Sequence, residues 1–200
     1  MSSMKKAVFI DRDGTISEEV GYINHASRFK LFPYSADAIR RLNENGWLAI
    51  ITTNQAGVAR GYFNEDLIHA VHERLRAGLA AGGAQLDGIY YCAHHPSLGE
   101  PPYRVDCDCR KPKPGLISRA AHDLDIDLGE SWMVGDRYSD IEVARNAGVK
   151  SAFVLSGYGR GEWEHQRESW KIQPDLVAED LLEAVEFITA HSHSKVGNPG

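Results

Sequence analysis

An apolar run that ends in two aspartates constrains this chain more than any other stretch. Residues 7–10 read Ala-Val-Phe-Ile, and Asp11, Asp13 and Gly14 follow. Four consecutive apolar residues are typical of a strand buried on both faces of a parallel sheet, and Gly14 allows a sharp exit from it. Ligands of open α/β sheets bind at the carboxyl ends of the strands. The aspartates therefore indicate a functional site, although Asp and Gly are also ordinary turn residues.

Apolar runs alternate with helical periodicity along the rest of the chain. Strands are predicted at 47–54, 88–92, 131–136, 151–155 and 175–177. Helices are predicted at 35–45, 64–79, 114–124, 140–147 and 179–189. The alternation predicts an α/β fold in which a parallel central sheet carries helices on both faces. We expect residues 1–190 to form a single domain, with a flexible charged loop at 157–170, and residues 191–200 to form a disordered tail.

Composition limits the classes of function. A chain of 200 residues, 42 % hydrophobic and 25 % charged, suits one globular domain. The formal net charge of −6 argues against nucleic acid or an anionic membrane as a partner, so we expect a small-molecule substrate. No membrane-spanning run or signal peptide is recognisable, and we expect a cytoplasmic protein. We also expect a monomer.

The cysteines of the chain are clustered in sequence. Cys92, Cys107 and Cys109, together with His94, supply three thiolates and one imidazole, an ordinary ligand set for a structural Zn²⁺ site. His95 is the competing histidine, and the Cys-x-His spacing favours His94. The loop between the two halves of the cluster is rich in proline and poor in apolar residues, so bound metal would offset its disorder. The alternative, small buried cysteines, explains the clustering poorly.

Polar side chains stand at four predicted strand ends or helix starts. They are Asp11 with Asp13, Thr53, the pair Arg110 and Lys111, and Asp136. Parallel strands bring such groups to one edge of the sheet. The set suits phosphoryl transfer, which requires a nucleophile, a proton donor, a divalent cation and positive charge around the transferring group.

Four segments, in the order DRDGT, TTN, RKPKPG and GDRYSD, resemble the motifs of the haloacid dehalogenase (HAD) superfamily of phosphatases. The resemblance implies a Rossmann-like fold in which Asp11 attacks phosphorus, forming an aspartyl-phosphate, and Asp13 protonates the leaving oxygen and then activates water. It implies Mg²⁺ held by Asp11, the backbone carbonyl of Asp13, and Asp136. Thr53 and Lys111 are the implied catalytic residues that bind the phosphoryl oxygens.

Two further expectations concern the surroundings of these motifs. Asp140 lies one helical turn beyond Asp136 and is interpreted either as an outer-shell Mg²⁺ ligand, which we favour, or as part of a helix N-terminus. Only residues 14–52 separate the first two motifs, which leaves no room for a large cap domain. Loops must therefore shape the site.

The segments GYINH, TTNQAGVARGYF, LDGIYYCAHHP and DCDCRKPKPG narrow the resemblance. They are similar to phosphatases of the D-glycero-D-manno-heptose-1,7-bisphosphate 7-phosphatase and histidinol-phosphatase type, and closer to the former. The resemblance implies hydrolysis of the heptose 7-phosphate in the synthesis of lipopolysaccharide or S-layer precursors. The implied substrate contacts are Glu19, Val20, Gly21, Tyr22, Thr53, Asn54, Gln55, Ala56, Arg110 and Lys111. Ala56 departs from the pattern, in which serine is familiar.

A bisphosphate carries a second dianion, so a cation beyond Lys111 is expected. Arg110 is the main candidate and Arg60 a further one, although Arg60 is equally well explained as a solvated surface residue. Cys109, the last predicted zinc ligand, directly precedes Arg110, so zinc would hold two phosphate-binding side chains. We therefore expect removal of zinc to lower turnover.

Two alternatives of function stay open. The same machinery would serve a histidinol-phosphate phosphatase or another small phosphomonoesterase, and Glu19 is available to meet the ammonium of histidinol phosphate. A zinc-stabilised nucleic-acid-binding module is the distant alternative, which the acidic chain and the absence of interleaved basic and aromatic residues disfavour.

Overall fold

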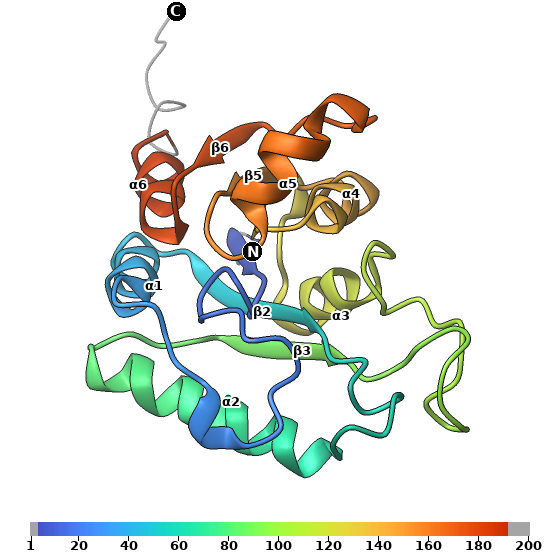
Figure 1. The fold of residues 1–200 in the computed structure, drawn as a ribbon. Coiled ribbons are helices and arrows are strands. Elements are labelled where there is room, and N and C mark those ends of the chain that lie inside the picture. Colours follow the sequence, from blue (N-terminus) through green and yellow to red (C-terminus); the bar gives the residue numbers. More distant parts are fainter. Residues whose placement is uncertain (1–3, 192–200) are drawn as a thin grey trace, which may run out of the picture.

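A six-stranded parallel sheet forms the centre of the computed structural model, which describes residues 4–191 (Figure 1). Its strands are β1 (Ala7–Ile10), β2 (Leu48–Asn54), β3 (Gly88–Cys92), β4 (Trp132–Gly135), β5 (Lys150–Val154) and β6 (Leu176–Ala178). Their order in the sheet is β3-β2-β1-β4-β5-β6, and every neighbouring pair is parallel. The predicted parallel sheet is confirmed, with strand bounds shifted by about one residue.

The order of the strands reverses between β1 and β4. From β1 the chain adds β2 and β3 on one side and later adds β4, β5 and β6 on the other. Ile10 is in register with Ile51 of β2 and Val134 of β4, so β1 and β4 end nearly level, while β2 extends further to Asn54. Such a reversal is where open α/β sheets bind ligands. Asp11 follows β1 and Asp136 follows β4, so both carboxylates lie at this point.

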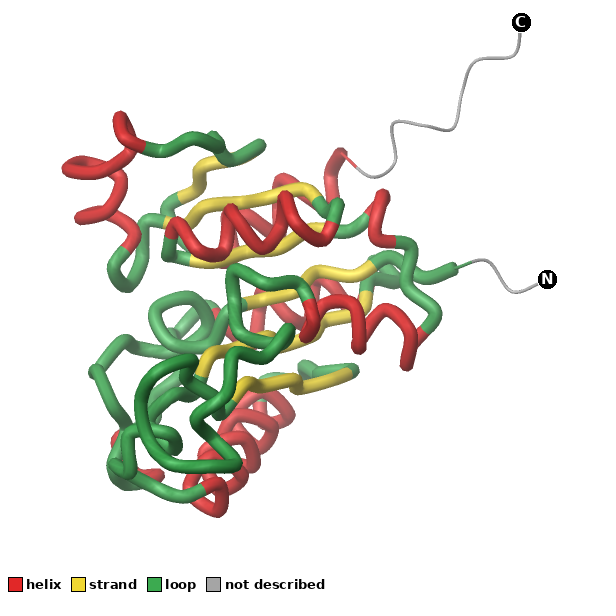
Figure 2. Tube along the Cα trace, turned by 90° about the vertical axis from the view of Figure 1, so that its right-hand side faces the viewer, coloured by secondary structure: helices red, strands yellow, loops and turns green. Residues whose placement is uncertain are grey.

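Helices cover both faces of the sheet, as predicted (Figure 2). They are α1 (Ser35–Glu44), α2 (Glu65–Ala81), α3 (Gly115–Leu124), α4 (Tyr138–Ala147), α5 (Gly159–Gln166) and α6 (Leu181–His191), with 3-10 turns η1 (Ala26–Arg28), η2 (Leu128–Glu130) and η3 (Arg167–Ser169). Alternate residues of β1 point to opposite layers: Val8 joins the cluster of α1, α2 and α6, whereas Phe9 joins that of α3 and α4.

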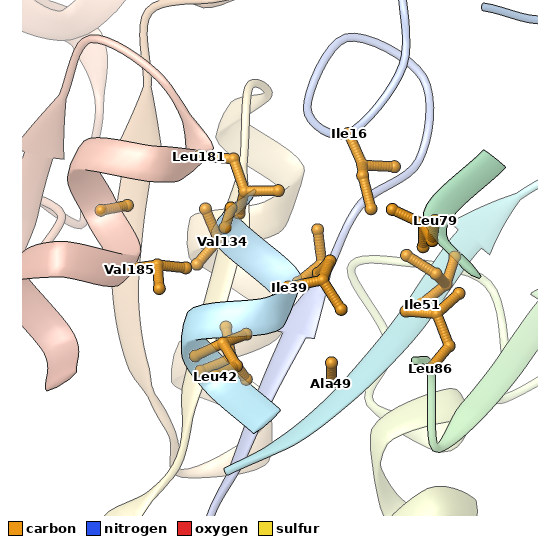
Figure 3. Packing of buried hydrophobic residues seen from close by; sticks show 14 of the residues in the cluster. Ile16, Ile39, Leu42, Ala49, Ile51, Leu79, Leu86, Val134, Leu181 and Val185 are labelled. Atoms are coloured by element: carbon orange, nitrogen blue, oxygen red, sulfur yellow. The ribbon is translucent and has the colours of Figure 1, made fainter. Parts of the chain in front are cut away.

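The first of these layers is the larger. In Figure 3, Ile39 and Leu42 of α1 lie between Ile51 of the sheet and Leu181 and Val185 of α6. All five side chains are fully buried. Burial of one such side chain stabilises a fold by about 1.5–3 kcal/mol. This packing keeps the strand ends, and the residues that follow them, in fixed positions.

The prediction of a flexible loop at 157–170 is wrong. Helix α5 and turn η3 occupy most of it. Trp163 and Trp170 pack around Phe153 of β5, with ring centroids 6.0 and 5.0 Å from it. Because two tryptophans make these contacts, without a repeating apolar stripe, the segment lacks the periodicity that predicts a helix.

A disordered tail was predicted at residues 191–200. Helix α6 includes His191, and residues 192–200 lie outside the described residues.

Loops surround the carboxyl end of the sheet. Between β1 and β2 the described structure holds η1 and α1 as its only helical elements, so no large cap domain is inserted there. The longest irregular stretches, drawn green in Figure 2, gather at one end of the strands. None of the helices in residues 4–191 has the length and apolar character needed to cross a membrane.

Candidate active site

Three carboxylates meet where β1 and β4 end. Oxygens of Asp11, Asp136 and Asp140 all lie within 4.8 Å of one another. Asp136 and Asp140 are fully buried. Asp136 accepts one hydrogen bond at each oxygen, from the Thr15 hydroxyl at 3.2 Å and the Tyr158 backbone N–H at 2.8 Å. Loops that follow β1 and β5 thus orient a carboxylate that follows β4.

Two glycines allow these loops to approach Asp136. A Cβ atom at Gly14 would lie 2.2 Å from Oδ2 of Asp136, and one at Gly157 would lie 2.3 Å from the same atom. Both residues have positive φ, 88° and 55°, a region that other residues rarely adopt. The glycine of the DRDGT segment is therefore required by packing as well as by the turn.

Lys111 neutralises part of this acidic cluster. Its Nζ donates to Asp11 Oδ1 at 2.8 Å, to Asp140 Oδ1 at 2.7 Å and to the Thr52 carbonyl at 3.1 Å. Asn54, the last residue of β2, holds its backbone: the Lys111 N–H donates to Asn54 Oδ1, and Asn54 Nδ2 donates to the Lys111 carbonyl, both at 3.1 Å. The tip of β2 thereby positions the lysine.

The cluster has more negative than positive charge. Burial raises the pKa of Asp11 to about 6 although Lys111 opposes the shift, and burial with the charges of Asp11 and Asp140 raises the pKa of Asp136 well above its usual range. Burial disfavours the charged form of Lys111, but the two carboxylates outweigh it and raise its pKa. Three carboxylates around one ammonium suit a hard divalent cation such as Mg²⁺, which binds oxygen ligands and supplies the missing charge.

Of the two interpretations of Asp140, the structure shows the place at a helix N-terminus. It occupies the first turn of α4, where its Oδ2 accepts the Arg137 backbone N–H at 3.1 Å, as an N-terminal capping residue does. Its other oxygen binds Lys111 beside Asp11 and Asp136. The outer-shell role of Asp140 stays a prediction.

A polar pocket of about 390 Å³ opens above these groups. It is lined by Asp11, Asp13, Glu19, Tyr22, Thr53, Asn54, Arg110, Lys111, Arg137 and Ser139. A neighbouring hollow of about 270 Å³ shares Glu19, Tyr22 and Arg137 with it and reaches Gly21, Gln55 and Ala56. Most of the predicted substrate contacts therefore line one or the other of these two neighbouring hollows.

Two of the predicted contacts lie outside the lining of both hollows. Val20 packs against the main hydrophobic core, and Arg60 is exposed with its guanidinium 5.9 Å from the ring of Tyr22. Arg137 is a pocket residue that the sequence interpretation omitted. Its Nε lies 2.8 Å from Oε1 of Glu162, and its guanidinium carbon is 4.5 Å from the Tyr158 ring centroid. The sequence signal that could have identified Arg137 is its position inside the GDRYSD segment.

The predicted zinc ligands come together beside this pocket. Cys92, His94, Cys107 and Cys109 offer ligand atoms within 4.8 Å of one another. Their Sγ–Sγ distances of 3.2 and 3.5 Å approach the roughly 3.8 Å that ~2.3 Å bonds in a tetrahedral zinc site require. Burial opposes ionisation of Cys107, but hydrogen bonds from Cys109, His94 and Cys92 outweigh it and lower its pKa to about 7. The donor set and its geometry fit Zn²⁺.

His94, and not His95, belongs to this cluster. Nδ1 of His95 accepts the backbone N–H groups of Ser97 and Leu98 at 3.2 and 3.1 Å, which directs it into its own loop. Arg110 is tied to the cluster, because its Nη1 donates to the His94 carbonyl at 3.3 Å. The cysteine cluster and the pocket thus share a structural support.

Fold and site together define a HAD-like hydrolase, and a family model described as HAD-hydrolase-like matches residues 108–184. The chain is 44 % identical over 94 % of its length to a D-glycero-D-manno-heptose-1,7-bisphosphate 7-phosphatase of Thermosynechococcus vestitus, and covers 97 % of that protein. It is 43 % identical over 92 % of its length to a D-glycero-beta-D-manno-heptose-1,7-bisphosphate 7-phosphatase of Pasteurella multocida, again covering 97 %. The chain belongs to this family of phosphatases.

A solved structure agrees with this assignment. A D,D-heptose 1,7-bisphosphate phosphatase from B. bronchiseptica, complexed with magnesium and phosphate, superimposes with a TM-score of 0.82 at 30 % identity. The match covers 93 % of this chain and 99 % of that one.

Proposed function

We propose that this chain hydrolyses the 7-phosphate of D-glycero-D-manno-heptose 1,7-bisphosphate. The observation that carries the proposal is the carboxylate cluster of Asp11, Asp136 and Asp140 with Lys111. Asp11 and Lys111 line a pocket that also holds Arg110 and a fourth carboxylate, Asp13. The names of the relatives in the matched family support the substrate.

The chemistry follows from the roles proposed for the two aspartates. An oxygen of Asp11 forms a bond to phosphorus while the bond from phosphorus to the sugar oxygen breaks, and Asp13 gives that oxygen its proton. As a carboxylate, Asp13 then takes a proton from the water that attacks the aspartyl-phosphate. Inorganic phosphate leaves and the carboxylate of Asp11 is restored. Lys111, on giving up one of its present acceptors, and Thr53 are proposed to hold the phosphoryl oxygens.

Magnesium is the proposed cofactor of this reaction. Mg²⁺ held by Asp11, the Asp13 carbonyl and Asp136 would neutralise charge that develops on the phosphoryl oxygens. The excess of carboxylates over cations in the cluster supports this assignment. So does the similar structure in complex with magnesium and phosphate.

The sugar and its second phosphate are proposed to occupy the rest of the pocket. Arg110 and Arg137 supply guanidinium groups at its wall: Arg110 also donates to the His94 carbonyl and Arg137 also pairs with Glu162, and the remaining N–H donors of each suit binding of a phosphate. Segments 19–22 and 53–56 are proposed to contact the sugar, through Glu19 and Tyr22 in the first of them.

Zinc is proposed as a structural metal, held by Cys92, His94, Cys107 and Cys109. The short distances among the three sulfur atoms and the hydrogen bond from Arg110 to the His94 carbonyl support this. In that arrangement the metal fixes the loop from which Arg110 reaches the pocket.

The proposed function is tested by measuring phosphate release from the two anomers of heptose 1,7-bisphosphate and from histidinol phosphate. We expect kcat/KM for one anomer of heptose 1,7-bisphosphate to exceed that for histidinol phosphate by more than about tenfold, a difference of ~1.4 kcal/mol in transition-state stabilisation. Asp11→Asn should release phosphate only at the uncatalysed rate. Equal or reversed preference would favour the histidinol-phosphate alternative, for which Glu19 in the pocket wall is the specific support. Normal turnover by Asp11→Asn would overturn the mechanism.

A further inference from the structure

Buried polar side chains lie in series behind Asp13, outside the pocket lining. The side chain of Arg12 is only 3 % exposed, and its Nε and Nη2 donate to the two carboxylate oxygens of Asp13 at 3.0 and 2.7 Å. Its remaining nitrogen, Nη1, lies 3.4 Å from Nε2 of His72, a buried residue of α2. Helix α2 therefore contributes a side chain to the support of a residue that follows β1.

The contact with Arg12 determines how His72 is protonated. A guanidinium has donors only, so Nε2 of His72 accepts and the ring proton lies on Nδ1. This requires a neutral ring. Burial and the positive charge of Arg12 lower the pKa of His72 to about 3, so the imidazole is neutral at pH 7.

Gln55 holds Asp13 from the other side. Its Nε2 donates to Asp13 Oδ2 at 3.0 Å and to the Thr53 hydroxyl at 2.9 Å. Both oxygens of Asp13 thus have fixed donors, and the planar fork of Arg12 sets the plane of the carboxylate as well as its position. Proton transfer to a leaving oxygen depends on that orientation.

We propose that His72 is a positioning residue for Asp13: its imidazole anchors the guanidinium of Arg12, which in turn orients the carboxylate toward the ester oxygen. The proposal deepens the proposed function, since it rests on the role of Asp13 as the acid. Without an acceptor at His72, the buried Nη1 atom would lack a partner, and the guanidinium would turn to find one. Asp13 would turn with it, while Thr53 and Lys111 would still bind phosphate.

Substrates with different leaving groups test this role. A sugar alkoxide leaves poorly without a proton, whereas p-nitrophenolate leaves readily without one. We would measure kcat/KM, which reports the steps through departure of the leaving group, for heptose 1,7-bisphosphate and for p-nitrophenyl phosphate. His72→Phe removes the acceptor and His72→Gln keeps one. His69→Gln is the matched control, because His69 lies on the same helix and contacts the same Tyr91 ring, but is exposed and makes no contact with Arg12 among the described interactions.

We expect His72→Phe to lower kcat/KM about 10- to 100-fold for the sugar phosphate and less than about threefold for p-nitrophenyl phosphate. His72→Gln should restore most of the loss, and His69→Gln should match the wild type. Equal losses with both substrates would show a merely structural role, and no loss would show no role; either result overturns the proposal.

Two controls keep the outcome interpretable. If circular dichroism shows that His72→Phe does not fold, His72→Met fills the same space with only a weak acceptor and gives the same comparison. If the wild type ignores heptose bisphosphate but hydrolyses glycerol 3-phosphate, the proposed substrate is wrong, and the leaving-group comparison proceeds with that alkyl ester.

Discussion

Lys111 is the residue on which the electrostatics of the site depend most. Its ammonium has three donors, and Asp11, Asp140 and the Thr52 carbonyl accept one each. The side chain is 4 % exposed, so its ammonium has lost almost all of its contact with water. Such a charge is tolerated because its partners are carboxylates within hydrogen-bond distance. The lysine thus has a structural role in addition to its proposed contact with phosphate.

Substitution of Lys111 by methionine should therefore lower stability as well as activity. Two buried carboxylates would lose their common partner, which costs about 3–5 kcal/mol for a buried pair. Urea unfolding at pH 7 without added Mg²⁺ measures the change. Lys113→Met is the matched control, since Lys113 pairs with Asp106 in an exposed position and should contribute little. Equal unfolding curves for Lys111→Met and the wild type would contradict the account.

At the scale of elements, the loop between β3 and α3 is held at several points. Cys92 ends β3, and the other cysteines return to it from the far side of the loop. Tyr103 of the loop and Tyr91 of β3 both donate to the carboxylate of Glu65, in the first turn of α2. These two hydrogen bonds lower the pKa of Glu65. The loop that carries Arg110 is thereby fixed to both the sheet and α2.

Adjacent histidines in this loop should respond differently to substitution. We expect His94→Gln to lose bound zinc and to lower turnover several-fold, because the loop that orients Arg110 loses a metal ligand. His95→Gln should keep both zinc and turnover, since His95 accepts only from its own loop. Metal content by atomic absorption, with turnover at saturating Mg²⁺, measures both. Zinc loss in His95→Gln alone would mean that the ligand assignment is wrong.

At the scale of the whole molecule, two hydrophobic layers hold the strands of the sheet in place. One packs α1, α2 and α6 against the sheet and the other packs α3 and α4. Because β1 contributes to both layers, the strand that precedes Asp11 is fully buried along its length. The position of the nucleophile therefore depends on the core as a whole.

Alanine substitution of a buried and of a partly exposed phenylalanine tests how much the core contributes to the free energy of unfolding. Phe9→Ala should cost about 3–5 kcal/mol of unfolding free energy, because Phe9 is 0 % exposed in the central strand. Phe187→Ala, at a residue of α6 that is 37 % exposed, should cost about 1 kcal/mol through its ring contacts with Trp132 and His191. Chemical denaturation measures both, and similar losses would contradict the layered core.

Local patterns were enough to predict most of the elements. The buried strands are short continuous apolar runs, and the helices carry apolar residues on one face, so their periodicity is visible in sequence. Helix α5 was missed because its stability comes from Trp163 and Trp170 packing on Phe153, which lies in another element. A contact of that kind leaves no periodic trace within the segment itself.

By itself the sequence determined the parallel α/β architecture, the carboxylate pair after the first strand and the cysteine and histidine set of the loop, because each depends on neighbouring residues. The structure places His94 with the cysteines, as the Cys-x-His spacing favours, but only the tertiary structure decided that Arg137 lines the pocket and that His72 supports Arg12 behind Asp13. Each of these depends on side chains that folding brings together from separate elements or aims in one direction. The order of residues in the sequence specifies neither which distant side chains meet nor the direction in which a side chain points.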